Sequence, residues 1–189
     1  MLKSTKTTPL NFWANFLLIF GSLGLLLSFY LIFQRYNPQN LSFQIGSSKI
    51  DYKVSDSEIA EPVGVKINSA NIALPIIPSK IDDNKWESTT KGASFLKTSV
   101  NPGEIGNSIL YGHNWPNLLG NLTKVKPGDK VTVFYADNST RDFLVEYTAQ
   151  VRPEDITILK NSEDRRITLY TCTGFLDSKR FVVVAKLLV

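Results

Sequence analysis

The chain has 189 residues, 43% hydrophobic and 20% charged, with one cysteine, one histidine and a formal net charge of +4 at pH 7. This length allows one domain and a short appendage, and the composition is that of a folded protein. Three of the 21 basic residues are Lys3, Lys6 and Arg35, whereas residues 36–189 carry 18 basic and 17 acidic residues. Because the folded part is nearly neutral, the net charge does not indicate nucleic-acid binding by a basic face.

The N-terminal segment contains a long uncharged stretch. Residues 10–33 are 24 consecutive residues without charge, rich in Leu, Phe and Ile, and about 20 apolar residues suffice to cross a bilayer as a helix. A cleavable signal peptide has a shorter apolar core and a small-x-small cleavage site, and residues 33–38 offer no such site. We therefore expect a short basic tail over residues 1–9 and an uncleaved transmembrane signal anchor over 10–33, with a buried core helix as the alternative.

Positive charge sets the expected orientation of this anchor. Lys3, Lys6 and the α-amino group precede the span, and Arg35 follows it. The positive-inside rule favours a cytoplasmic N-terminus, which places the rest of the chain outside the cytoplasm.

The sequence predicts a polar stalk over residues 34–62. Turn formers and scattered charges occur there without a convincing period, and such a segment would hold the following domain away from the lipid.

From about Val63 the chain changes to short β-like runs separated by turn residues, which predicts a β-sandwich or barrel over residues 63–189. We expect residues 85–97 to contain a short helix or loop, and residues 117–125 one or two helical turns. The expected strands are Val63–Ile67, Ile72–Ile77, Ser108–Tyr111, Lys130–Tyr135, Asp142–Val151, Arg166–Cys172 and Arg180–Val189.

The only cysteine, Cys172, ends one of these runs. An odd cysteine in an exported domain indicates intermolecular pairing or a reactive thiol, and the alternative is a buried structural thiol. Side chains alternate along a strand, so Ile167, Leu169 and Thr171 share a more apolar face that we expect to form the core. The opposite face then turns Cys172 toward the surface or a cleft.

Arg180 opens the next run after a connection of seven residues, 173–179. If the two runs pair as a hairpin, the thiol and the guanidinium lie at the same end of the sheet. A nearby cation lowers the pKa of a cysteine and can stabilise the oxyanion that forms when a thiolate attacks a carbonyl. The alternative for Arg180 is a solvated charge at a loop edge.

His113, the only histidine, follows a predicted strand and a glycine. An imidazole can act as acid or base near neutral pH, but spacing alone does not bring His113 to Cys172, and a loop histidine without function is the alternative. One histidine and one cysteine do not make a tetrahedral zinc set.

These residues carry a family pattern. Thr168–Cys172, with the sequence Thr-Leu-Tyr-Thr-Cys, resembles the Thr-Leu-x-Thr-Cys signature of the sortases. Arg180 at the start of the next run fits the same family, as do the stretches Pro102–His113 and Leu122–Val133. The resemblance covers roughly residues 63–189, together with the membrane anchor.

This resemblance implies a mostly β fold, a sortase-type eight-stranded β-barrel with short helical turns, preceded by one transmembrane helix. It also implies a cysteine transpeptidase in which the Cys172 thiolate attacks the Thr–Gly carbonyl of a Leu-Pro-x-Thr-Gly-like sorting signal on an exported protein. An amine of a peptidoglycan precursor or a pilin lysine would then accept the acyl group. His113 would be general acid and base, Arg180 would bind substrate and stabilise the oxyanion, and Thr171 would help line the site. The chemistry requires no metal or organic cofactor.

Two alternatives stay open from the sequence. One is a sortase-like enzyme that mainly hydrolyses its thioacyl intermediate. The other is a non-catalytic, membrane-anchored β module that binds a wall polymer or a protein. The loop between Cys172 and Arg180 is shorter than in several sortase classes, so the sequence leaves the preferred pentapeptide open.

Overall fold

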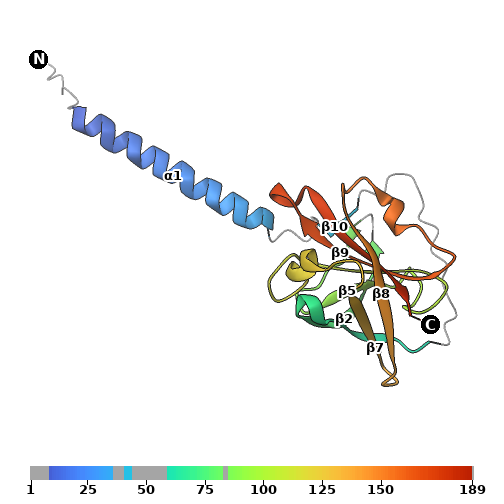
Figure 1. Cartoon of the computed structure of the whole chain (residues 1–189). Helices are drawn as coiled ribbons and strands as arrows, with labels where there is room; N and C mark the ends of the chain where they lie inside the picture. The colour runs from blue at the N-terminus through green and yellow to red at the C-terminus, as the bar shows by residue number, and fades with distance from the viewer. Residues whose placement is uncertain (1–8, 36–40, 44–58, 83–84, 189) are drawn as a thin grey trace, which may run out of the picture. The chain divides into compact units, whose positions relative to one another are not determined.

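The computed structural model describes residues 9–35, 41–43, 59–82 and 85–188. The chain divides into two units, Met1–Asn37 and Pro38–Val189, which are described separately (Figure 1).

The first unit contains one long helix, α1, over Pro9–Arg35. Pro9 stands at the first helical position, where its missing N–H leaves no intrahelical hydrogen bond unmade. Within α1, Phe12–Gln34 is long and apolar enough to cross a membrane, with a mean hydropathy of 2.4 and none of this stretch buried. The helix contains the 24 residues for which the sequence predicts a signal anchor.

The second unit is a closed β-barrel with the strand order β1-β2-β5-β6-β9-β10-β8-β7. Neighbouring strands pair antiparallel, except that β2 pairs with β5 and β6 with β9 in parallel. The barrel strands are β1 Pro62–Ile67, β2 Ile72–Ser79, β5 Ala93–Leu96, β6 Gly106–Gly112, β7 Lys130–Tyr135, β8 Thr140–Val151, β9 Arg165–Thr173 and β10 Lys179–Leu187. The eight-stranded, mostly β fold that the resemblance implies is confirmed.

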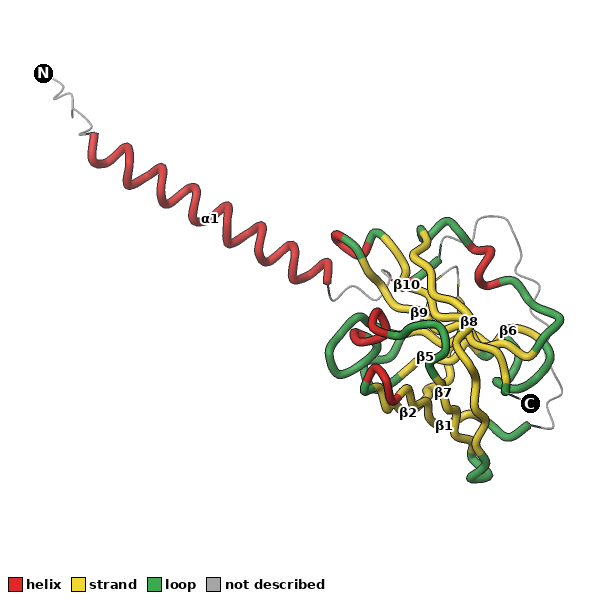
Figure 2. Tube along the Cα trace, viewed as in Figure 1, coloured by secondary structure: helices red, strands yellow, loops and turns green. Residues whose placement is uncertain are grey.

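Short elements connect these strands (Figure 2). They are the 3₁₀ turns η2 Asn68–Ala70, η3 Gly120–Lys124, η4 Ile156–Leu159 and η5 Phe175–Asp177, and the two-stranded sheet of β3 Ile81–Asp82 and β4 Lys85–Trp86. The predicted helical turn within residues 117–125 is confirmed by η3. Within residues 85–97 the structure has β4, a loop and β5 instead of a helix, because Ala93–Leu96 is fully buried between two neighbouring strands.

Two hydrophobic clusters lie on the two faces of the barrel wall, one inside the barrel and one outside. The larger cluster fills the interior and takes side chains from all eight strands, including Leu110, Leu169 and Val183. The smaller cluster covers the outer face of β6, β9 and β10 and includes Tyr111, Tyr170, Cys172 and Val182. Because both faces of β6, β9 and β10 are covered in this way, these strands are buried along most of their length.

Candidate active site

Cys172 lies near the end of β9 on the outer face of the barrel. Ile167 and Leu169 belong to the interior cluster, whereas Tyr170 and Cys172 belong to the outer one, so the predicted alternation is confirmed. The expectation that this face is open is wrong, because Cys172 is only 3% exposed. Other parts of the chain cover the outer face at this point.

Arg180 lies directly across from Cys172. In the antiparallel pairing of β9 and β10, Arg180 is in register with Cys172, so the hairpin that the loop length predicts is confirmed. Arg180 is 3% exposed and is not a solvated charge. Its Nη1 donates to the carbonyls of Asp177 (2.8 Å) and Lys179 (3.0 Å), and its Nη2 donates to the carbonyl of Ser42 (2.9 Å).

One N–H donor of the Arg180 guanidinium makes no hydrogen bond to the described residues. Arg180 Nε is buried and has no hydrogen-bond partner among the described residues. A buried donor without a partner costs free energy, so a carbonyl oxygen arriving beside Cys172 would be stabilised if it reached this N–H.

His113 lies on the opposite side of Cys172 from Arg180. Strand β6 runs parallel to β9, with Gly112 in register with Thr171. His113 directly follows Gly112, and Cys172 directly follows Thr171, so the two residues lie side by side at this end of the two strands. Parallel neighbours lie about 4.8 Å apart, which brings the imidazole and the thiol to the same end of the sheet. This pairing supplies the placement that sequence spacing does not.

The surroundings of His113 fix its ring. The imidazole stacks on Trp115 with ring centroids 4.5 Å apart and an interplanar angle of 13°. Its Nε2 makes a hydrogen bond of 3.3 Å with Ser88 Oγ. The side chain is 6% exposed, so the ring is held by packing as well as by the hydroxyl.

Thr171 directly precedes Cys172 on β9. It is fully buried, and as the strand neighbour of Cys172 it points to the opposite face of β9. Its Oγ1 donates a 2.7 Å hydrogen bond to the carbonyl of Gly112. Thr171 therefore ties β9 to the residue before His113, and it does not line the face that carries the thiol.

Burial controls the protonation of both candidate catalytic groups. Burial raises the pKa of the Cys172 thiol to about 12, against the opposing effect of the Arg180 charge. The expected lowering by the nearby cation is therefore outweighed, because desolvation disfavours the thiolate more than Arg180 favours it. Burial also lowers the pKa of His113, and the charge of Asp177 only partly offsets this effect. The resting pair is a neutral thiol beside a neutral imidazole.

A short segment of the chain, Leu41–Phe43, packs on the outer face near Arg180 and Cys172. Leu41 and Phe43 are buried. The Phe43 ring meets Tyr170 edge-on at 4.9 Å between centroids and lies 6.2 Å from Trp86. These residues fall in the predicted polar stalk, but here the chain returns to the barrel; residues 36–40 and 44–58 of that stalk lie outside the described residues.

The backbone of this segment is also bound. Tyr170 donates its hydroxyl to the carbonyl of Leu41 at 3.2 Å, and Arg180 donates to the next carbonyl, that of Ser42. The Arg180 guanidinium also lies over the Phe43 ring, 5.8 Å from its centroid. Side chains on β9 and β10 thus hold two successive carbonyls of the chain's own Leu41–Phe43 segment on this face.

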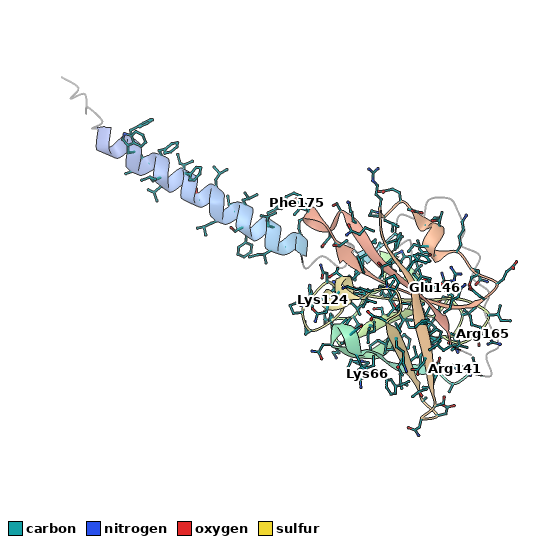
Figure 3. The ribbon with its side chains drawn as sticks, viewed as in Figure 1. Lys66, Lys124, Arg141, Glu146, Arg165 and Phe175 are labelled. Atoms are coloured by element: carbon teal, nitrogen blue, oxygen red, sulfur yellow. The ribbon has the colours of Figure 1, made fainter. Side chains whose placement is uncertain are left out.

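The β9–β10 loop rises beside the same end of the barrel. Leu176 and Asp177 adopt positive φ values of 51° and 58°, which cost free energy in residues other than glycine, and this backbone turns the Asp177 carbonyl to Arg180. Phe175 is 84% exposed and projects from the tip of the loop (Figure 3). The loop thus exposes an apolar ring to solvent.

A pocket of about 410 Å³ lies on the His113 side of the site. Its walls come from β2, β4, β5 and the loop between the last two, and Ser88 in that loop is the residue bonded to His113. The lining residues are Ile77, Pro78, Ser79, Trp86, Glu87, Ser88, Thr89 and Ser94. The sequence did not predict this pocket, because no motif marks it and two of its walls come together through the parallel pairing of β2 with β5.

These parts define the class of the site. A thiol on a strand flanked by the strands that carry an imidazole and a guanidinium suits covalent acyl transfer. Among the described residues, no three His, Cys, Asp or Glu side chains cluster so as to hold a metal ion.

Comparison with known proteins places the chain in a family. A family model described as the sortase domain matches residues 65–188, so the chain belongs to the sortase family. Sortase A of Bacillus anthracis is 29% identical over 127 residues, which are 65% of this chain and 58% of that protein. Sortase A of Listeria monocytogenes is 31% identical over 124 residues, 62% of this chain and 55% of that protein. The matched region therefore spans less than two thirds of these relatives.

Solved structures agree with this assignment. The crystal structure of Listeria monocytogenes sortase A has a TM-score of 0.56 at 26% identity and covers 70% of this chain and 89% of that one. Sortase A from Corynebacterium diphtheriae has a TM-score of 0.60 and covers 84% of this chain and 82% of that one; at 23% identity it shows the fold alone.

Proposed function

We propose that this chain is a membrane-anchored cysteine transpeptidase that cleaves a sorting signal and transfers its acyl part to an amine. The observation that supports this most is the strand register around Cys172. Antiparallel pairing puts Arg180 on one side of the thiol, and parallel pairing puts His113 on the other. Membership of the sortase family supports the same assignment.

The first half-reaction follows from the resting protonation states. A proton moves from the Cys172 thiol to His113, and the thiolate attacks the carbonyl carbon of the scissile peptide bond. Arg180, whose Nε has no partner among the described residues, donates to the oxyanion. The C–N bond then breaks, His113 returns its proton to the leaving amine, and a thioester on Cys172 remains.

This reaction requires Leu41–Phe43 to leave its place. Carbonyls of this segment accept hydrogen bonds from the Arg180 guanidinium and the Tyr170 hydroxyl. A donor peptide needs the same face and the same donors, so it competes with this segment for them. Displacement would also let water or a peptide group reach the thiol, and this would lower the pKa of Cys172 from its raised value.

The sorting signal, the acceptor and the location are parts of the proposal. The donor is an exported protein with a Leu-Pro-x-Thr-Gly-like motif, cut between Thr and Gly, and the acceptor is an amine of a peptidoglycan precursor or a pilin lysine. Helix α1 spans the membrane once with its N-terminus in the cytoplasm, and residues 63–189 form the catalytic domain outside. The apolar stretch Phe12–Gln34 supports a membrane span.

The burial of the thiol favours a second candidate function. A cysteine that is 3% exposed with a raised pKa is also what a non-catalytic, membrane-anchored module would contain. Such a module would bind a wall polymer or protein through the barrel, and the thiol would resist modification.

One experiment separates the two candidates. The full-length chain in detergent micelles is incubated with a Leu-Pro-x-Thr-Gly peptide library and an amine acceptor, and ligated products are identified by mass spectrometry. We expect ligation by the wild-type chain and none by Cys172→Ala. If the wild-type chain yields only Thr-ended hydrolysis products, the enzyme is a hydrolase. If it yields neither, the non-catalytic candidate is favoured.

A further inference from the structure

The pocket beside His113 is placed to receive the second substrate of the proposed reaction. We propose that it binds the acceptor as a primary ammonium group attached to a peptide, with Glu87 as the residue that attracts the charge. This inference rests on the proposed function and specifies the acceptor side of the same site.

The strand order separates this pocket from the donor side. Across the barrel wall the strands run β2, β5, β6, β9, β10. The pocket lies on β2 and β5, His113 follows β6, Cys172 is on β9, and Arg180 is on β10. A donor held by Arg180 therefore leaves the His113 side of the thioester open, and the pocket lies on that side in the strand order.

The pocket touches the imidazole through one residue. Ser88 contributes to the wall, and its Oγ lies 3.3 Å from His113 Nε2. The group that accepts the proton of an incoming amine is thus at the edge of the pocket. General-base catalysis requires this reach, directly or through one intervening group.

The lining suits an ammonium group with peptide amides behind it. The exposed carboxylate of Glu87 accepts one backbone hydrogen bond, from Lys80 N to Oε2 at 3.0 Å, and no cation pairs with it in the described part of the chain. The hydroxyl oxygens of Ser94 and Thr89 each accept one backbone N–H, which leaves their hydrogens for carbonyl oxygens of a ligand.

The side-chain hydroxyl of Tyr111 ties two walls of the pocket together. Tyr111 is fully buried, and its hydroxyl bonds to Ser79 Oγ at 3.0 Å and to the backbone carbonyl of Glu87. Because Tyr111 lies on β6, two residues before His113, the same strand positions the pocket wall and the imidazole.

The chemical step balances without a co-reactant. The ammonium group loses one proton to water as it moves from Glu87 toward the thioester. The neutral nitrogen then attacks the carbonyl carbon, the C–N bond forms and the C–S bond breaks. The second proton passes to His113 and then to the departing Cys172 thiolate, which regenerates the neutral thiol and imidazole.

The test measures acceptor kinetics with the full-length chain in detergent micelles and a Leu-Pro-x-Thr-Gly peptide as donor. Triglycine amide offers a terminal ammonium, Nα-acetyl-lysine amide offers a side-chain ammonium, and hydroxylamine is an uncharged nucleophile at neutral pH. The variants are Glu87→Gln, which keeps the acceptor oxygen for Lys80 N, and Glu87→Lys, which reverses the charge. Glu163→Gln is the matched control, because it removes an exposed carboxylate just before β9, at the opposite end of that strand from Cys172.

We expect Glu87→Gln to raise the KM of a charged acceptor about threefold to fivefold, as for an exposed ion pair, and Glu87→Lys to raise it about tenfold. The hydroxylamine reaction, the hydrolysis rate and the Glu163→Gln variant should be unchanged. An effect on one of the two charged amines identifies whether a terminal or a side-chain ammonium binds.

Two results would overturn the acceptor pocket while the proposed function stands. One is a thioacyl-enzyme that forms normally, with the KM of both charged amines unaffected by Glu87→Lys. The other is an equal effect on hydroxylamine, which would show a loss unrelated to charge. If the wild-type chain forms no thioacyl-enzyme, the proposed function and the pocket assignment fail together.

Discussion

The two sides of Cys172 differ in what fills them. On the Arg180 side, the chain's own segment Leu41–Phe43 covers the face. Two of its carbonyls accept hydrogen bonds from Tyr170 and Arg180, and the Phe43 ring packs against Tyr170. On the His113 side a pocket of about 410 Å³ borders the imidazole through Ser88. In the proposed reaction, the donor would therefore displace a bound segment, whereas the acceptor would enter a pocket that is already formed.

The largest expected effect concerns the His113 side. We expect His113→Ala to lower the rate of acyl transfer about 10³-fold, because a positioned general acid and base typically contributes about 10²–10⁴-fold to the rate. The measurement is the steady-state rate of ligation with hydroxylamine as acceptor. The melting temperature of the variant serves as the control for folding, and a loss below tenfold would remove His113 from the proton relay.

The pH dependence of thiol alkylation tests how deeply the site is buried. Because burial raises the pKa of Cys172 to about 12, the thiolate fraction increases about tenfold per pH unit between pH 7 and pH 9. The alkylation rate with iodoacetamide should therefore rise about 100-fold over this range without reaching a plateau. A plateau near pH 8 would mean that the Arg180 charge outweighs desolvation, as the sequence alone suggests.

The next effect concerns the Arg180 side. We expect Arg180→Lys to lower kcat/KM for the donor peptide by about 10–100-fold, because an ammonium group cannot reproduce the planar set of donors. The same substitution should leave the partition of the thioacyl-enzyme between water and amine unchanged. A change in that partition would mean that Arg180 also acts on the acceptor side.

The smallest effect concerns the segment that occupies the donor side. We expect Phe43→Ala to raise the alkylation rate of Cys172 about tenfold at pH 7.5, because it removes the ring that packs on Tyr170 and Trp86. The matched control is Phe134→Ala, which removes a ring 38% exposed on β7, away from β9 in the strand order. Equal alkylation in the wild-type chain and Phe43→Ala would show that the segment does not cover the thiol.

Local sequence patterns predicted those parts of the site that depend on neighbouring strands. Alternation along β9 placed Cys172 off the barrel interior, and the seven-residue connection placed Arg180 beside it. His113 needed the family resemblance, because the parallel pairing of β6 with β9 joins residues 59 apart, as in the bond between Thr171 and Gly112.

The remaining features depend on contacts too distant for any local pattern. The hydrogen bond from Arg180 to Ser42 joins residues 138 positions apart. The short sequence Leu41-Ser42-Phe43, which stands among turn-forming residues, does not predict this contact. The burial of Cys172, and with it the raised thiol pKa, follows from packing on the outer face that includes this contact. Sequence reasoning therefore found the catalytic candidates but predicted an open thiol.

Acylation of Cys172 by a donor peptide can be measured by intact-protein mass spectrometry of the full-length chain, quenched in acid after mixing with a Leu-Pro-x-Thr-Gly peptide. We expect a mass increase equal to the peptide acid that ends at threonine minus one water, located on Cys172 by fragmentation and absent from Cys172→Ala. The adduct should disappear when triglycine amide is added. An unmodified wild-type chain in the presence of cleaved peptide, or an adduct on another residue, would contradict it.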